Sequence, residues 1–111
     1  MTVLVKVLIP AKIAEATQVT QYTATGVTTI IDKFTATNYS ASAATISVNL
    51  VTAADTAGNQ NLITKTKTLQ PAEVYTFPEL VGQVLMASGF ISTIAGTATS
   101  INIRASGREV S

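Results

Sequence analysis

The sequence predicts an all-β fold: a two-layer antiparallel β-sandwich, jelly-roll or immunoglobulin-like, with one short helix near residues 78–86. About six to eight short runs alternate between apolar and polar residues, which is the period of a half-buried strand. Clusters of glycine, proline, asparagine and serine separate these runs at the spacing of turns. Threonine, which suits a pleated sheet, is abundant, and only 12% of the residues are charged.

A chain of 111 residues has the length of one domain with a single core. We expect residues 1–18 to form an N-terminal strand or arm and residues 19–111 to form the sandwich, both within one compact domain. The first strand, Val3 to Ile9, is apolar on both faces apart from Lys6. Such a strand is covered on both sides or extends onto a partner.

Pro10 is predicted to end this first strand, because proline cannot donate to a β-ladder. Residues 11–17 then form a short link with room for one helical turn. A polar strand is predicted from Val19 to Thr25, where Gly26 stops it.

The next strand is predicted from Val27 to Thr37, with Ile30, Phe34 and Ala36 on one face. Asp32 falls on that same face, which indicates a bulge or an edge position. The following stretch reads TATNYSASAATISVNLV. We interpret it as two antiparallel strands joined by a turn at residues 38–42, since asparagine and serine side chains bond to nearby backbone.

Strands are also predicted at residues 62–69, 74–77, 90–95 and 99–105. In the first of these, Lys65 and Lys67 lie on the face opposite the threonines, as in an edge strand protected against stray pairing. Pro78 stands where a helix begins, and the apolar spacing that follows predicts the short helix, although Gly82 weakens it.

The residues that usually perform chemistry are scarce. The chain has no histidine and no cysteine, so the commonest general base and the thiolate metal ligands are missing. Glu73 and Glu79 are a formal acid and nucleophile pair, but turn positions favour solvated carboxylates. We predict no catalytic residue, no metal site and no cofactor, and rank an enzyme behind two binding functions.

Seven basic residues face six acidic ones, for a net charge of +1, and they are scattered along the chain. This pattern disfavours nucleic acid and anionic membranes as partners. The N-terminus lacks a basic region before its short apolar run, and no run reaches the length of a membrane span. We therefore expect the protein to be made and used without crossing a membrane by the general secretion route.

Two binding functions remain open on residue patterns alone. Few ions and many threonines and alanines make a surface that is easily desolvated against another protein. The alternative is a secreted adhesin or carbohydrate-binding module. Tryptophan is absent, and Tyr39, in the predicted turn, is the aromatic ring best placed for a sugar, whereas Tyr75 is expected in the core.

Three segments carry a family resemblance: IDKFTATNYSASAATISVNLV, LQPAEVYTFPELVGQVL and SINIRASGREV. Over roughly residues 31–110 the chain resembles small virion proteins of tailed bacteriophages, the capsid decoration or cement proteins. The segments at 78–83 and 103–109 are the most distinctive, whereas the first 25 residues match no part of that pattern. The resemblance implies a β-sandwich that is made in the bacterial host cytoplasm, lies on the outer capsid surface of a virion, binds the major capsid protein and holds its subunits together. Closed symmetry predicts a homo-oligomer there, a dimer or a trimer.

Two groups of residues are the candidate interface. The apolar first strand is expected to provide either subunit pairing or strand addition to the capsid. The basic residues near the C-terminus and on the lysine-bearing strand are expected at the polar rim. The candidates are Val3, Val5, Lys6, Val7, Ile9, Lys65, Lys67, Arg104 and Arg108.

Overall fold

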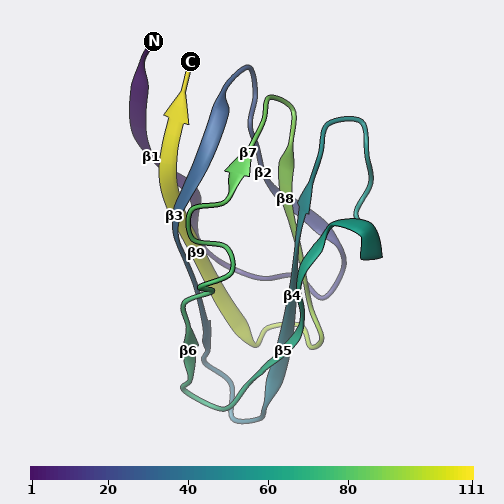
Figure 1. Ribbon diagram of the computed structural model, residues 1–111. Helices are drawn as coiled ribbons and strands as arrows, with labels where there is room; N and C mark the ends of the chain where they lie inside the picture. The colour runs from purple at the N-terminus through teal and green to yellow at the C-terminus, as the bar shows by residue number, and fades with distance from the viewer.

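The computed structural model describes residues 1–111 as two antiparallel sheets packed face to face, which confirms the predicted β-sandwich (Figure 1). The strands are β1 (Val3–Ile13), β2 (Val19–Thr23), β3 (Thr28–Asn38), β4 (Ala44–Val51), β5 (Leu62–Leu69), β6 (Val74–Tyr75), β7 (Val84–Leu85), β8 (Phe90–Ala95) and β9 (Ile101–Val110). The one helical element is a 3-10 turn, η1 (Asn59–Asn61), and no helix has the length and apolarity of a membrane span.

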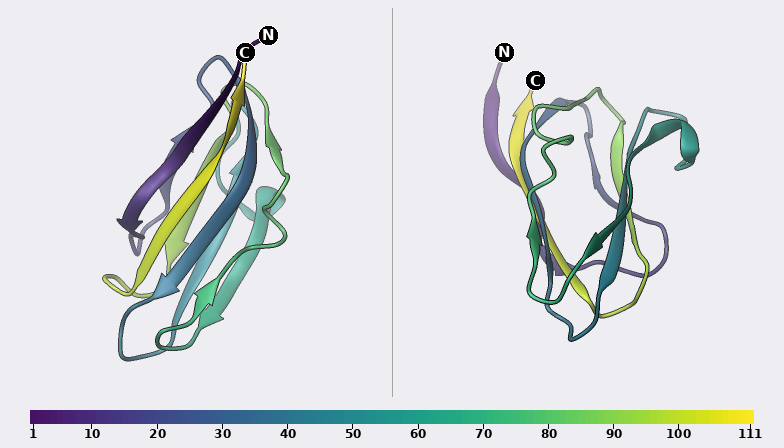
Figure 2. Two further views of the ribbon diagram at one scale, coloured as in Figure 1. Left: turned by 90° about the vertical axis from the view of Figure 1, so that its left-hand side faces the viewer. Right: turned by 60° about the horizontal axis from the view of Figure 1, so that its bottom comes forward.

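The first sheet has the strand order β1-β9-β3-β6, and β7 also pairs with β3. The second sheet has the order β2-β8-β4-β5. Figure 2 shows β1, β9 and β3 running side by side, with β1 at the margin of the first sheet. The second sheet ends in β5, so the predicted edge position of that strand is confirmed.

The core fills the space between the sheets, where each strand contributes its inward-facing residues. The Phe34 and Phe77 rings meet edge to face with centroids 4.7 Å apart, and Tyr75 lies 4.6 Å from Phe77. The largest fully buried side chains are Phe34, Phe77, Ile9, Ile31, Ile46, Leu69, Leu80, Ile91, Ile101, Ile103, Val48 and Val51.

Pro10 does not end the first strand, and the predicted boundary there is wrong. The strand β1 continues to Ile13, with register shifts against β9 between Val7 and Ile9 and between Ile9 and Lys12. An edge strand tolerates proline, because one side of it has no ladder to complete. No helical turn follows, since residues 11–13 belong to β1.

The predicted turn after β3 exists, but the predicted pairing of its flanking strands is wrong. The strand β3 lies in the first sheet and β4 in the second, so the turn crosses between the layers. Buried Asn38 holds this crossing: its Nδ2 donates to the carbonyls of Ser42 and Leu69, both at 2.9 Å. Its Oδ1 accepts from the Ser40 N–H at 2.9 Å.

The predicted bulge at Asp32 is confirmed. Ile31 pairs with Gly107 and Lys33 with Ser106, so Asp32 is the extra residue on β3. The bulge places Asp32 on the outer, solvent face of the first sheet. It also breaks the predicted alternation, because Ile31 and not Ile30 shares the buried face with Phe34 and Ala36.

The predicted short helix at 78–86 is wrong. Two successive turns replace it, the first closed by a 2.9 Å hydrogen bond from Leu80 N–H to the carbonyl three residues earlier. Gly82 has a φ of +86°, which no right-handed helix accepts, and its N–H donates to the Ile31 carbonyl at 2.7 Å. Leu80 and Leu85 both reach the core from this path, so the same apolar spacing fits a turn followed by a strand.

The last strand is longer than predicted. The strand β9 runs from Ile101 to Val110, with Ile101 and Ile103 facing the core as expected. It is central in the first sheet and pairs with β1 on one side and β3 on the other.

Candidate binding surface

The first half of β1 presents apolar side chains to solvent. Val3 and Leu4 are about half exposed, Val5 is 81% exposed and Val7 is 40% exposed. The strand pairs with β9 on one side only. Its other side therefore carries backbone donors and acceptors with no strand partner within the chain.

The pairing of β1 with β9 decides which backbone groups face this open side. Thr2 and Ser111 exchange both of their N–H to carbonyl bonds, at 3.2 and 2.9 Å. Hydrogen-bonded and non-hydrogen-bonded pairs alternate along an antiparallel ladder. The N–H and C=O groups of Val3, Val5 and Val7 therefore point away from β9 and toward solvent.

The side chains of these valines lie on the outer face of the first sheet. Val5 is directly opposite Arg108, which places their side chains on one face. Arg104 is also on that face and exposed. The structure therefore brings Val3, Val5, Val7, Arg104 and Arg108 onto one continuous surface, which we call the outer-sheet surface.

Arg108 is held in place by Asp32 at the bulge of β3. Its Nη2 and Nε donate to the Asp32 oxygens at 2.9 and 3.0 Å. The guanidinium lowers the pKa of Asp32, and the carboxylate raises the pKa of Arg108. Both side chains are more than 40% exposed, so the pair mainly fixes geometry.

Lys6 points to the other face, toward the space between the sheets. Its Nζ lies 3.2 Å from Glu109 Oε2, which also accepts from the Tyr22 hydroxyl at 2.5 Å. The hydrogen bond from Tyr22, with a smaller contribution from Lys6, lowers the pKa of Glu109. Burial and Glu109 raise the pKa of Tyr22 to about 12. The charge of Lys6 is therefore compensated within the protein.

Ile9 is not part of any surface, which corrects its assignment to the candidate interface. The register shift after Val7 turns both Leu8 and Ile9 inward, and Ile9 is fully buried against Ala105 in the core. Strict alternation from Val3 had placed Ile9 with the valines, and the bulge breaks that alternation.

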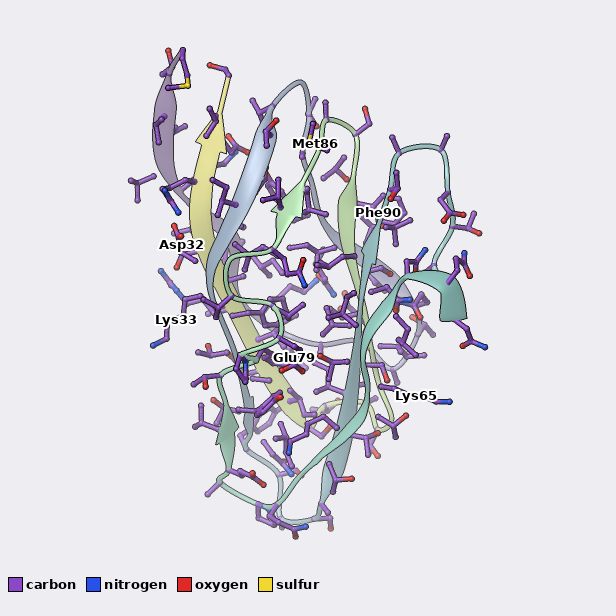
Figure 3. All side chains as sticks on the ribbon, viewed as in Figure 1. Asp32, Lys33, Lys65, Glu79, Met86 and Phe90 are labelled. Atoms are coloured by element: carbon purple, nitrogen blue, oxygen red, sulfur yellow. The ribbon has the colours of Figure 1, made fainter.

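Lys65 and Lys67 lie on the second sheet, away from the outer-sheet surface. Thr66 has a φ of +49° and interrupts the alternation, so the two lysines do not share a face as predicted. Figure 3 shows Lys65 pointing to solvent on the side opposite Asp32 and Lys33. Lys67 instead lies over the Tyr75 ring, 4.7 Å from its centroid, at the margin between the sheets.

Glu79, labelled in Figure 3, links the two sheets at this margin of the sandwich. Its carboxylate accepts from Thr64 of β5 at 2.5 Å and from the Tyr75 hydroxyl at 2.6 Å. Burial acts to raise the pKa of Glu79, but these hydrogen bonds outweigh it, and the net pKa lies below the ordinary value. Of the two carboxylates in the formal acid and nucleophile pair, Glu79 links the two sheets, whereas Glu73 accepts from the Gln70 N–H at 2.8 Å.

This link predicts acid sensitivity. A depressed carboxyl pKa stabilises the fold above the unfolded value of 4.5 and loses that contribution as the pH falls through the folded value. We expect Glu79→Gln to lower the free energy of unfolding by about 1–2 kcal/mol at pH 7 and by less at pH 3. Urea titrations at both values measure this. An equal loss of unfolding free energy at pH 7 and pH 3 would contradict a stabilising role for the ionised Glu79 carboxylate.

An apolar hollow beside β7 was not predicted from the sequence. It has a volume of about 260 Å³ and is lined by Leu50, Ile63, Val84 and Met86, among others. The helix predicted for this segment gave no indication of it, and Val84 and Met86 are 50% and 67% exposed. No three acidic side chains gather anywhere to form a metal site.

Comparisons with known proteins add no evidence on the function of this chain, which has to be argued from its own residues. No protein-family model, no curated protein and no solved structure matches this chain.

Proposed function

We propose that this protein is a structural virion protein that binds the outside of a tailed-phage capsid and stabilises contacts between major capsid subunits. The resemblance of residues 31–110 to decoration proteins favours the major capsid protein as the partner. The structure supports the mode of action, which is attachment between protein surfaces.

One observation carries this proposal: β1 presents exposed valines on the outer-sheet surface beside an open strand edge. The open edge is a template for strand pairing, which is one recurring mode of protein recognition. The exposed valines lie on the face of the sheet, so they remain available to a capsid protein when the edge itself is paired with another strand.

The outer-sheet surface supplies the polar rim beside this edge. Arg104 is exposed, and Arg108 is oriented by Asp32, so both present donors at its border. On a shell, the same weak contact is repeated many times, and the effective concentration raises occupancy without high affinity for each copy.

Imaging of purified phage particles from the host that makes this protein tests the proposal. We expect this chain to be traced in the outer layer of the shell, in contact with the major capsid protein. Particles whose outer layer lacks the chain would contradict the proposal, and recovery of the protein on the host cell surface would favour the adhesin.

Charge reversal tests the rim. We expect Arg104→Glu to reduce particle occupancy by about tenfold at low salt and by less at high salt, because rim charges act mainly on association. Lys65→Glu on the opposite side of the sandwich is the matched control and should leave occupancy unchanged. If the two variants reduced particle occupancy equally, Arg104 would not belong to the polar rim of the interface.

A further inference from the structure

We propose that β1 pairs with β1 of a second copy, antiparallel and centred on Val5, to form a two-fold dimer with one continuous sheet. This inference does not depend on the capsid being the partner, because it rests on the edge alone.

The edges of the sandwich differ in how they are protected. The strands β6 and β7 have two residues each, and β2 has five. The edge β5 carries exposed Lys65 and a backbone irregularity at Thr66, both of which oppose pairing. The edge β1 has eleven residues, and its segment Val3–Val7 lies before the register shifts and Pro10, so this segment lacks such protection.

The single lysine in the exposed part of β1 does not block pairing. Lys6 faces the inner side of the sheet and is paired with Glu109 at 3.2 Å. The open side of the strand therefore carries no uncompensated charge, in contrast to the exposed Lys65 of β5.

Only one register of self-pairing gives every outward N–H and C=O group of Val3, Val5 and Val7 a hydrogen-bond partner. With Val5 opposite Val5 of the second copy, Val3 is opposite Val7, and all their outward N–H and C=O groups face each other. The register ends just before Pro10, which has no N–H to donate. Centring on Val7 instead would bring the bulge at Leu8 and the proline into the pairing.

This register brings no unpaired charge into the interface. Leu4 pairs with Glu109 within one copy, and Lys6 of the other copy would lie opposite Leu4. The two Lys6 side chains then become diagonal neighbours across the new interface. Each keeps its own Glu109 at 3.2 Å, which offsets the repulsion between them.

The side chains also complement one another. Val5 is 81% exposed in the single chain and would meet its own equivalent on the outer face. Val3 would meet Val7, so the exposed valines of both copies form three adjacent cross-strand pairs in one apolar patch. A second copy is the occupant that matches this edge in backbone register and side-chain size while adding no unpaired charge.

Cysteine cross-linking tests the register directly, because the chain has no cysteine of its own. In the proposed dimer, residues 5 face each other at a Cα separation of about 5.5 Å, within disulfide range. Residues 3 of the two copies lie about 14 Å apart, beyond that range.

We expect Val5→Cys to form a covalent dimer under mild oxidation about tenfold faster than Val3→Cys or Val7→Cys alone. A mixture of Val3→Cys and Val7→Cys should cross-link between the two variants as readily as Val5→Cys does with itself. Non-reducing gels measure the cross-linking rates. Because the three valines are exposed, we expect the cysteine substitutions to leave the fold intact, and circular dichroism checks this.

Cross-linking of Val5→Cys no faster than Val3→Cys alone would overturn the proposal. Wild-type protein that sediments as a monomer at all concentrations while still decorating particles would also overturn it, and would assign β1 to strand addition on the capsid. A dimer that ignores particles would instead refute the proposed function and leave the self-pairing intact.

Discussion

Replacing Gly107 by alanine is expected to lower the free energy of unfolding by about 3 kcal/mol, through overpacking in the middle of the first sheet. A Cβ at this position would lie 2.1 Å from the Ile30 carbonyl oxygen and 2.9 Å from Leu8 Cδ1. The first of these is backbone of β3 and cannot rotate away. The strand β9 would have to separate from β3 or lose the inward packing of Leu8.

Gly26→Ala is the matched control for this variant. Gly26 has a φ of +69° and no atom within 4 Å of the added methyl group, so only the conformational cost of about 1–2 kcal/mol applies. Urea denaturation followed by circular dichroism compares the two variants. If Gly107→Ala were no more destabilising than Gly26→Ala, the close approach of β9 to β3 would be refuted.

Phe77→Ala is expected to cost about 3–5 kcal/mol, because it leaves a cavity in the core. The Phe77 ring is fully buried and contacts Phe34 and Tyr75. It anchors the irregular segment between β6 and β7, which has no regular ladder of its own. A loss of this size is a large part of the stability of a domain of this length.

Val81→Ala in the same segment is the control. Val81 is 50% exposed, and its truncation should change the free energy of unfolding by about 0.5 kcal/mol or less. Thermal unfolding of both variants gives the comparison. Similar small effects for the two residues would mean that this segment is not anchored by Phe77.

The β-sandwich was predictable because short runs that alternate small hydroxyl and apolar residues form half-buried strands, whose apolar faces pack against a second sheet. The edge position of β5 and the bulge at Asp32 followed from charged residues that interrupted this alternation. These are local signals, and each could be interpreted without knowledge of the strand order.

The errors arose where one pattern fits two structures. Leu80 and Leu85 satisfy helical spacing, but a left-handed Gly82 and pairing with β3 send the chain along a different path to the same core. The turn at Asn38 resembles a hairpin in sequence, yet its side chain bonds to the other sheet. Tertiary contacts decide such cases.

The candidate surface was predictable only where it depends on a local sequence pattern. Two apolar faces singled out Val3, Val5 and Val7, and their exposure agrees with that selection. Ile9 could not be separated from them, because a bulge leaves no mark in an apolar run. The pairing of Asp32 with Arg108, which are 76 positions apart, depends on a strand register that no local pattern contains.

The buried amide of Asn38 has a practical consequence for production of this protein in eukaryotic secretory cells. Asn38-Tyr39-Ser40 has the form of an N-glycosylation acceptor, and an oligosaccharide is transferred to the amide nitrogen. That nitrogen already donates to two carbonyls in the folded chain, so glycosylation and folding exclude each other. Ser40→Ala removes the acceptor and retains the backbone hydrogen bond from residue 40 to Asn38, which makes it the variant of choice for such hosts.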